Sequence, residues 1–248
     1  MMDNRKTVSA LILGGSCRLA LNLVPQLLDR RIRPLLTYRN SKGKERILSS
    51  LKPYTSAIEL IHLDFEDTKT LSQLAPYLKT GLNCLVDFAH SDYECLVGNA
   101  KDDEISAYFA TNITFRAMVL KRVARAMLAQ RKGRMVLISS TAVKTSNPGQ
   151  GFYAAAKLAA EALYRNTGLE MSSKGITSAI LRPGFIASGR GRRYLKKMPQ
   201  HYQSLKKSGQ IISDGDVTEA LLYLLFSTGT SINGTVLTLD GGMTVSKH

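Results

Sequence analysis

Residues 10–23 read ALILGGSCRLALNL, a short apolar run, two glycines and then apolar residues at helical spacing. Strand, glycine turn and helix in this order begin a nucleotide-binding βα unit. The usual turn has further glycines, where this stretch has Arg18 and Ala20. Gly14 still permits a tight turn, Gly15 adds backbone freedom, and Ala20 is the smallest replacement where helix and strand approach closely. We interpret the stretch as a modified nucleotide-binding turn.

The same alternation continues along the chain. Seven apolar runs of strand length are separated by stretches of helical spacing, which implies βαβ units, a mostly parallel sheet and helices on both faces. No linker or internal repeat interrupts the pattern, so we expect one α/β domain over residues 1–248. Strands are expected at 8–13, 33–38, 57–63, 83–89, 133–139, 176–183 and 235–240, and helices within 19–29, 44–51, 70–78, 108–130, 153–171 and 217–227.

Composition places the chain among ordinary globular proteins, with 44% hydrophobic and 21% charged residues. Its three cysteines form no CxxC pair and are odd in number, which argues against a disulfide framework and favours a reduced, cytoplasmic location. No apolar run approaches the roughly 20 residues of a membrane span, so we expect no membrane partner. The four histidines are scattered, without metal-ligand spacing, and we expect no metal site.

Positive charge is concentrated in one segment. The chain has 34 basic and 19 acidic residues, and residues 171–213 contain nine of the basic ones and no acid. Such a segment is typical of a solvated face, but it also suits an anionic substrate, a membrane surface or nucleic acid. Nucleic acid is the weaker alternative because no RNA-binding motif is present. Residues 187–213 look irregular, and we expect them to form a loop over the ligand site.

Ser140, Tyr153 and Lys157 carry the strongest chemical signal. Ser140 follows an apolar strand, and Tyr153 and Lys157 are four residues apart within a helical stretch, so they share one helix face. A phenol with a pKa of about 10 is a poor acid at neutral pH. A neighbouring ammonium lowers that pKa and makes the phenol a usable proton donor and acceptor. A serine hydroxyl across the site can hydrogen-bond a substrate carbonyl oxygen.

Taken together, these pieces make the chain similar to the short-chain dehydrogenase/reductase family over nearly its whole length. The resemblance implies a doubly wound Rossmann-type domain with a seven-stranded sheet of order 3-2-1-4-5-6-7. It also implies a homotetramer or homodimer through the long helices that begin near Ser106 and Tyr153. The matching pieces, besides the Ser–Tyr–Lys spacing, are LGGSCRLA at 13–20, LDFED at 63–67, LVDFAH at 85–90, TNITF at 111–115, LRPGFIAS at 181–188 and LDGGM at 239–243.

The resemblance assigns roles to individual residues. Tyr153 becomes the general acid and base, Lys157 lowers its pKa and binds the nicotinamide ribose, and Ser140 orients the substrate carbonyl. Asn112 supports a proton-relay water near the lysine. Asp64 contacts adenine. The full set of expected cofactor-binding residues is Gly14, Gly15, Ser16, Arg18, Leu19, Arg39, Asn40, Ser41, Asp64, Phe65, Ala89, His90, Pro183, Gly184, Ile186 and Ser188.

The turn after the second strand bears on which cofactor binds. An acid there holds the ribose 2′-OH of NAD, whereas an arginine accommodates the 2′-phosphate of NADP. This chain has Arg39, Asn40, Ser41 and Lys42, and no acid before Glu45. A guanidinium can bind a phosphate through two hydrogen bonds, so we predict NADPH as the cofactor. Arg18 either contacts phosphate, flanking the 2′-phosphate with Arg39, or points to solvent.

Two departures from the family pattern follow the fourth strand. Asp87, Phe88, Ala89 and His90 stand where the family has NNAG. The missing glycine places the His90 side chain near the adenine ribose or displaces the loop. His90 is a catalytic candidate, but we favour a loop histidine because Tyr153 and Lys157 already supply acid–base chemistry. The Asp87 carboxylate replaces a bracing amide, and the sequence shows no partner for it.

Two groups within the family offer substrates. The serine-to-tyrosine spacing and the closing DGG are shared with 3-oxoacyl-(acyl carrier protein) reductases, while Arg18-Leu19-Ala20 is similar to the turn of pteridine reductases. We predict an NADPH-dependent reductase of a carbonyl, either a 3-oxoacyl thioester or a small ketone. Acyl carrier protein is acidic, so the basic segment suits it, as it suits a coenzyme A substrate. The alternatives are a pteridine reductase-like enzyme and a catalytically weak NADP-binding sensor or scaffold.

Overall fold

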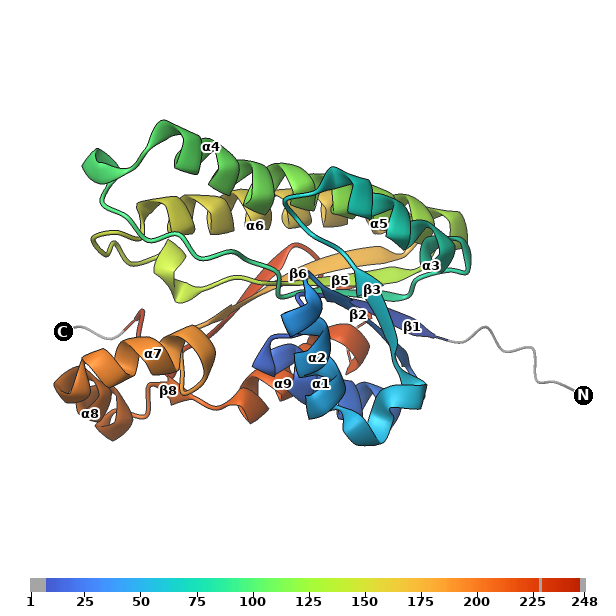
Figure 1. Cartoon of the computed structure of the whole chain (residues 1–248). Coiled ribbons are helices and arrows are strands. Elements are labelled where there is room, and N and C mark those ends of the chain that lie inside the picture. The colour runs from blue at the N-terminus through green and yellow to red at the C-terminus, as the bar shows by residue number, and fades with distance from the viewer. Residues whose placement is uncertain (1–7, 228, 246–248) are drawn as a thin grey trace, which may run out of the picture.

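The computed structural model describes residues 8–227 and 229–245 and consists of one parallel sheet between two layers of helices (Figure 1). The strand order β3-β2-β1-β4-β5-β6-β9 is the expected one, with the seventh expected strand as β9. All six strand pairs are parallel. The strands are β1 (Ser9–Leu13), β2 (Arg33–Tyr38), β3 (Glu59–His62), β4 (Cys84–Asp87), β5 (Gly133–Ile138), β6 (Ile176–Pro183) and β9 (Thr235–Leu239).

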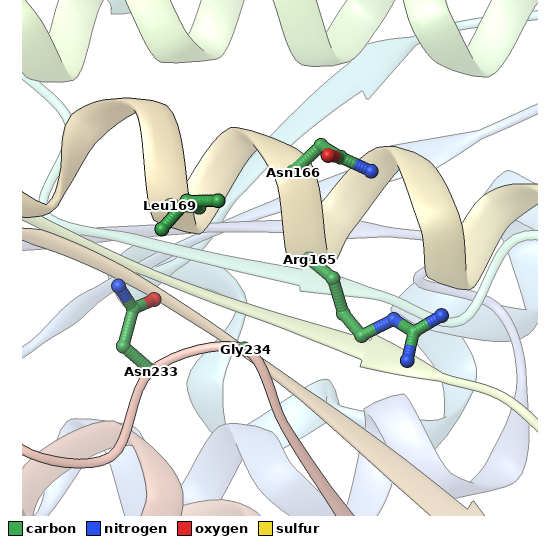
Figure 2. A pocket seen from close by; sticks show the side chains of 5 residues that line it. All are labelled: Arg165, Asn166, Leu169, Asn233 and Gly234. Atoms are coloured by element: carbon green, nitrogen blue, oxygen red, sulfur yellow. The ribbon is translucent and has the colours of Figure 1, made fainter.

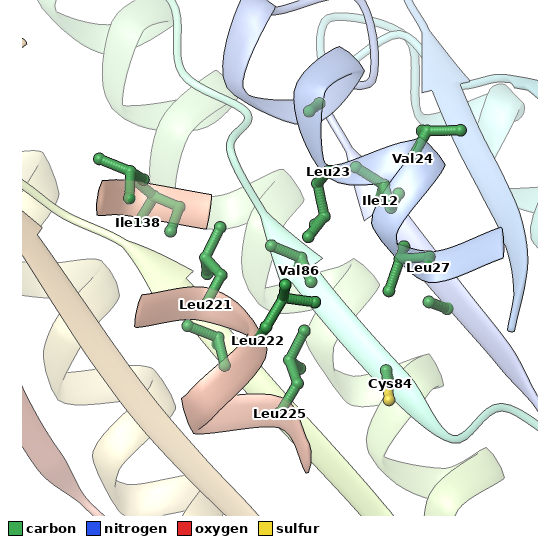
Figure 3. Packing of buried hydrophobic residues seen from close by; sticks show 14 of the residues in the cluster. Ile12, Leu23, Val24, Leu27, Cys84, Val86, Ile138, Leu221, Leu222 and Leu225 are labelled. Carbon is green, nitrogen blue, oxygen red and sulfur yellow. The ribbon is translucent and has the colours of Figure 1, made fainter. Parts of the chain in front are cut away.

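The sheet is buried on both faces, as apolar strands in a parallel sheet must be. Successive residues of β1 point to opposite faces, so Ile12 joins one core and Leu11 joins the other. Figure 3 shows the first core, where Leu23 and Leu27 of α1 and Leu221 near the C-terminus pack around Val86 of β4. The sheet is therefore held between two separate apolar layers.

Helices α1 (Arg18–Leu28), α2 (Ser41–Ser50) and α9 (Asp214–Leu222) cover one face of the sheet (Figure 1). Helices α4 (Asp102–Phe109), α5 (Phe115–Gln130) and α6 (Gly151–Met171) cover the other. The short helix α3 (Ala75–Lys79) lies on this second side. No helix in the described part of the chain is long and apolar enough to cross a membrane.

The helix predicted over 108–130 is interrupted. A single π-helical turn, Ala110–Thr114, separates α4 from α5 and carries the buried Asn112. The Phe115 amide donates to the Ala110 carbonyl, five residues back, so the turn is one residue wider than an α-helical turn. Such turns occur often at functional sites. A second π-helical turn, Tyr223–Ser227, follows α9.

The segment 187–213 is not the irregular loop that we expected. It forms helices α7 (Gly189–Lys197) and α8 (Pro199–Lys207), which lie beyond the carboxyl ends of the strands (Figure 1). Strands β7 (Phe185–Ile186) and β8 (Ile211–Ile212) pair in parallel at its base. Among the described side chains of these helices only Leu195 and Leu205 are buried, so the apolar periodicity that marks a core helix is missing from the sequence.

We predict that Gly15→Ala destabilises the fold at the glycine turn. A methyl group at this position would lie 2.7 Å from the Leu36 Cβ and 3.0 Å from the Thr37 carbonyl oxygen. Both distances are too short for unstrained contact, so β2 or the turn would have to shift. We expect urea unfolding to show a loss of about 1–3 kcal/mol. Gly98→Ala is the control, because its added methyl meets nothing within 4 Å. Equal stabilities for the two variants would contradict the account of this turn.

Candidate active site

The glycine turn between β1 and α1 forms a cradle that side chains would fill. Gly14 has φ +71°, and a Cβ there would lie 3.0 Å from the Ala89 Cα, so the turn packs directly against the loop after β4. The Gly14 and Gly15 amides donate to Thr37, to its hydroxyl at 3.0 Å and its carbonyl at 2.9 Å. The turn is thus held by β2 and packs closely against the loop after β4, in the tight form that a dinucleotide-binding turn requires.

The amino end of α1 follows this turn at once. Cys17 caps the helix, and its Sγ accepts a hydrogen bond from the Ala20 amide at 3.4 Å. Burial raises the pKa of the Cys17 thiol to about 11, so the cap is neutral and does not repel an anion. A helix amino end attracts phosphate through its dipole and amides. Ser16, Arg18 and Leu19 stand at this end, so the chain's own residues fit a pyrophosphate group.

The Arg18 side chain points to an acid of α9. Its Nε lies 2.6 Å from the Asp214 Oδ2, and Asp214 also accepts a hydrogen bond from the Ser188 hydroxyl. One carboxylate therefore joins the glycine turn, the segment after β7 and α9. The contact brings two of the predicted cofactor-binding residues, Arg18 and Ser188, to the same place. A phosphate contact for Arg18 stays a prediction.

The expected 2′-phosphate site lies at the end of β2. Arg39 is exposed there, and its Nη1 lies 3.1 Å from the Glu66 Oε1. Asn40 caps α2 by accepting from the Gly43 amide at 3.0 Å, and Ser41 begins that helix. A Cβ at Gly43 would lie 3.5 Å from the Ser16 hydroxyl, so this loop adjoins the glycine turn.

Glu66 is a partner for Arg39 that the sequence analysis missed. It lies on the segment after β3, and only the pairing of β2 with β3 brings it to Arg39. Its neighbours Asp64 and Phe65 each have a partner. The Asp64 Oδ1 accepts a hydrogen bond from the Glu66 amide at 3.0 Å, and the Phe65 ring stacks on Phe115 of α5 with centroids 4.5 Å apart.

The remaining predicted cofactor residues follow β6. Gly184 allows its backbone to pack on Asp240, since a Cβ there would lie 2.8 Å from the Asp240 Cβ. Pro183 ends β6 beside Leu239 of β9, and Ile186 pairs with Ile212 in the two-stranded sheet. This segment therefore has a defined course between the sheet and α7.

Ser140, Tyr153 and Lys157 are brought together, as expected. The Ser140 side chain is hydrogen-bonded to Tyr153, and the Lys157 Nζ lies 5.9 Å from the centroid of the Tyr153 ring. Lys157 is buried and donates to the Ile138 carbonyl at 2.8 Å. Ser140 follows β5, while the other two residues stand one turn apart on α6.

The electrostatics of this trio differ from the prediction. Burial raises the pKa of Tyr153, and the hydrogen bond with Ser140, which lowers it, does not offset the burial. The lowering that we expected from Lys157 is not found. Instead the pKa of Lys157 itself is lowered to about 7, first by burial and then by the charge of Arg116. Tyr153 is therefore protonated at neutral pH and is a weaker acid than an exposed phenol.

His90 lies against the phenol. Its ring meets the Tyr153 ring edge to face, with centroids 4.9 Å apart, and its Nε2 lies 2.8 Å from the Tyr108 hydroxyl. Further rings continue this wall: Tyr93 packs near Tyr108 and Phe152, and Phe109 packs near Phe152. The loop after β4, the end of α4 and the start of α6 thus place an aromatic wall, namely His90, Tyr93, Tyr108, Phe109 and Phe152, beside Tyr153.

Asn112 is held by several hydrogen bonds. Its amide donates to the Ser91 hydroxyl at 2.6 Å and to the Tyr108 carbonyl at 2.9 Å, and its side-chain oxygen accepts from the Ser91 amide at 3.1 Å. These bonds fasten the π-helical turn to the loop that carries His90. A relay water at Asn112 stays a prediction.

Asp87 has the partner that the sequence did not reveal. The Nε of Arg116 on α5 lies 2.8 Å from the Asp87 Oδ2, and the side chains of Arg116 and Asp87 are 1% and 0% exposed. Tyr164 of α6 also donates to Asp87, at 2.9 Å. A signal was present in the sequence, because Arg116 stands on the stripe of α5 whose other members, Val119, Val123 and Met127, are buried.

A second buried carboxylate, Glu161, lies on α6 one turn beyond Lys157. It accepts from the Ser139 hydroxyl at 2.5 Å and from the Arg182 Nε at 2.7 Å. Tyr153, Lys157 and Glu161 therefore follow one another at intervals of one turn along α6. The sequence analysis did not single out Glu161.

Two cavities lie away from these residues. One, of about 360 Å³, lies on the outer side of α6 and is lined by Arg165, Asn166, Leu169, Asn233 and Gly234 (Figure 2). The other, of about 550 Å³, lies at the amino ends of the strands, where Val8, Ile32 and Arg134 are among its lining residues. Neither is lined by a predicted site residue. Within the described residues no cluster of three or more His, Cys, Asp or Glu side chains is placed to hold a metal ion.

Comparisons with known proteins find similar sequences over nearly the whole chain. A family model described as enoyl-(acyl carrier protein) reductase matches residues 19–244. The 3-oxoacyl-(acyl-carrier-protein) reductase FabG of Haemophilus influenzae is 27% identical over 237 residues, covering 96% of this chain and 98% of the relative. That of Buchnera aphidicola is 27% identical over 246 residues, covering 98% and 99%.

Solved structures show the same fold. ElxO with NADP bound has a TM-score of 0.85 at 22% identity, covering 97% of this chain and 100% of that one. A variant of actinorhodin polyketide ketoreductase with NADPH has a TM-score of 0.87 at 20% identity, covering 99% and 100%. NAD⁺-bound xylitol dehydrogenase has a TM-score of 0.85 at 18% identity, covering 95% and 98%. Similar folds thus occur with either cofactor.

Proposed function

The chain belongs to the short-chain dehydrogenase/reductase family, and on that premise we propose that it reduces a substrate carbonyl with NADPH. The observation that carries the proposal is the meeting of Ser140, Tyr153 and Lys157 beside the glycine turn. A nicotinamide cofactor would supply the hydride. The protein's part is to position the reactants and to move the proton.

In this proposal the Tyr153 hydroxyl donates the proton to the substrate carbonyl oxygen. Burial raises the pKa of this group, so it is protonated at neutral pH but is a weaker acid than an exposed phenol, and it would donate to the carbonyl oxygen as negative charge develops there. The Ser140 hydroxyl, already hydrogen-bonded to Tyr153, orients the same oxygen. Lys157, buried next to the phenol, stands where a ribose and a developing oxyanion would lie, and with its pKa lowered to about 7 it is partly protonated near neutral pH. The glycine turn and the amino end of α1 would hold the pyrophosphate.

A 3-oxoacyl thioester is the substrate that the comparisons favour, since the FabG relatives are named for it. The chain adds its own support. Arg192, Lys196, Lys206 and Lys207 are exposed on α7 and α8, beyond the carboxyl ends of the strands. An acidic carrier protein, or the phosphates of coenzyme A, would be attracted to such a surface.

The aromatic wall beside Tyr153 favours a second candidate, a pteridine-like ring substrate. His90 and Phe152 belong to this wall, and a flat heterocycle can stack on aromatic rings of this kind. Comparing purified protein with acetoacetyl thioesters and with dihydropterins separates the two substrates.

We propose NADPH rather than NADH because Arg39 directly follows β2 with no acid beside it in sequence. Glu66 modifies this expectation. The Glu66 carboxylate forms an ion pair with the Arg39 guanidinium that would bind the 2′-phosphate. Both side chains are more than half exposed, so this ion pair is weak and a phosphate can replace the carboxylate.

We predict that Tyr153→Phe lowers the kcat for acetoacetyl thioester reduction by about 10²–10⁴-fold, because it removes only the proton donor. NADPH binding, followed by fluorescence, should be retained. Tyr223→Phe, on an exposed tyrosine far along the chain, is the matched control and should leave kcat unchanged. NADPH binding by the wild type with no oxidation across ketones, thioesters and dihydropterins would instead support the sensor alternative.

We predict opposite effects from the two partners at the end of β2. Arg39→Asp should raise the KM for NADPH far more than that for NADH, because the phosphate then faces a carboxylate. Glu66→Gln should lower the KM for NADPH about two- to fivefold, the equivalent of an exposed ion pair. Steady-state kinetics with both cofactors checks both. A cofactor preference that Arg39→Asp does not alter would contradict this assignment.

A further inference from the structure

The buried pair of Asp87 and Arg116 is unusual because it sets full charges in the core below the site. Asp87 ends β4, and Arg116 stands in the first turn of α5, with side chains 0% and 1% exposed. Burying two charges costs more than their attraction returns unless every remaining donor and acceptor is satisfied. The pair is therefore expected to be kept only with a full set of hydrogen bonds.

That set is present. Asp87 accepts from the Arg116 Nε, from the Tyr164 hydroxyl and from the Ala89 amide, at 2.8, 2.9 and 3.0 Å. The two terminal nitrogens of Arg116 donate to the backbone carbonyls of Asn112 and Ala89. The guanidinium thus ties together the loop after β4, which carries His90, and the π-helical turn, which carries Asn112.

We propose that Arg116 is a positioning residue of the active site, acting through Asp87 and the Ala89 and Asn112 carbonyls on the His90 loop and through its charge on Lys157. The inference rests on the proposed function for its meaning in catalysis. Its geometric basis is independent of it, because each of the contacts lies within the chain.

Besides burial, several charged groups shift the pKa of Lys157. Arg116 lowers the pKa of this lysine, while Asp87, Glu161 and Cys17 raise it, in that order of size. The Arg116 effect exceeds that of Asp87, so the ion pair as a whole lowers the pKa, in the same direction as burial. The titratable and charged groups around the site come from every packed element: Cys17 at the start of α1, Asp87 of β4, Tyr108 of α4, Arg116 of α5, and Tyr153, Glu161 and Tyr164 of α6.

A lysine with a pKa near neutrality can both give and take a proton under working conditions. Lys157 is one helical turn from Tyr153, and its Nζ faces that ring at 5.9 Å. An ordinary exposed lysine, with a pKa of about 10.4, stays protonated near pH 7.

Titration of Lys157 by NMR tests the proposal on the protein alone. Lysine labelled with ¹³C at Cε gives a signal for each lysine, and its absence in Lys157→Met assigns this one. We expect a wild-type midpoint near pH 7. The double variant Asp87→Asn with Arg116→Met replaces the ion pair by an amide and an apolar side chain. Since Arg116 lowers the pKa more than Asp87 raises it, removal of the pair should move the midpoint upward.

The matched control is Arg125→Met, which removes an exposed guanidinium from the same helix and should leave the midpoint unchanged. A double-variant midpoint equal to that of the wild type would overturn the proposal. So would a wild-type midpoint near that of an ordinary lysine, which decides the matter even if the double variant does not fold. Failure of the proposed function would show separately, as no NADPH oxidation with acetoacetyl thioesters. Where turnover occurs, the pH profile of kcat should move upward with the Lys157 midpoint.

Discussion

The buried ion pair between Asp87 and Arg116 is the constraint on which the geometry of the site depends. A carboxylate at the end of a buried strand cannot stay charged without partners, and here its partners come from α5, α6 and the following loop. Satisfying that one group fixes where three segments lie. Asn112, His90 and the face of α6 with Tyr153 and Lys157 are all placed by these segments. The buried ion pair thus helps to set the positions of these segments and the pKa of Lys157.

Most of the fold could be predicted from the sequence, because a buried parallel sheet needs continuous apolar strands. LVDFA and GRMVLIS stand out as such runs, and the helical stretches between them leave few possible topologies. The Ser140, Tyr153 and Lys157 cluster was also predictable, since spacing along one helix decides most of its geometry. The Tyr153 pKa was not predictable, because it depends on how deeply the phenol is buried rather than on which residues are its neighbours.

Other parts depend on contacts between distant segments. Arg116 stands in RAMVLKRVARAM, where repeated basic residues look like a solvated face, although its position coincides with the buried stripe of α5. Glu66 reaches Arg39 only because β3 lies beside β2. The sequence predicts a loop where α7 and α8 lie, because these helices bury few of their described side chains and show no apolar period. In each case the local pattern is weak and the tertiary contact decides.

A double-mutant cycle on Asp87 and Arg116, followed by urea unfolding, tests the central claim most directly. Asp87→Asn and Arg116→Met should each cost about 3–5 kcal/mol, because each alone leaves a buried charge or donor without its partner. Together they should cost far less than the sum, with a coupling energy of about 2 kcal/mol or more. Additive effects of the two substitutions would contradict the account, since they would mean that the pair does not act as a unit beneath the site.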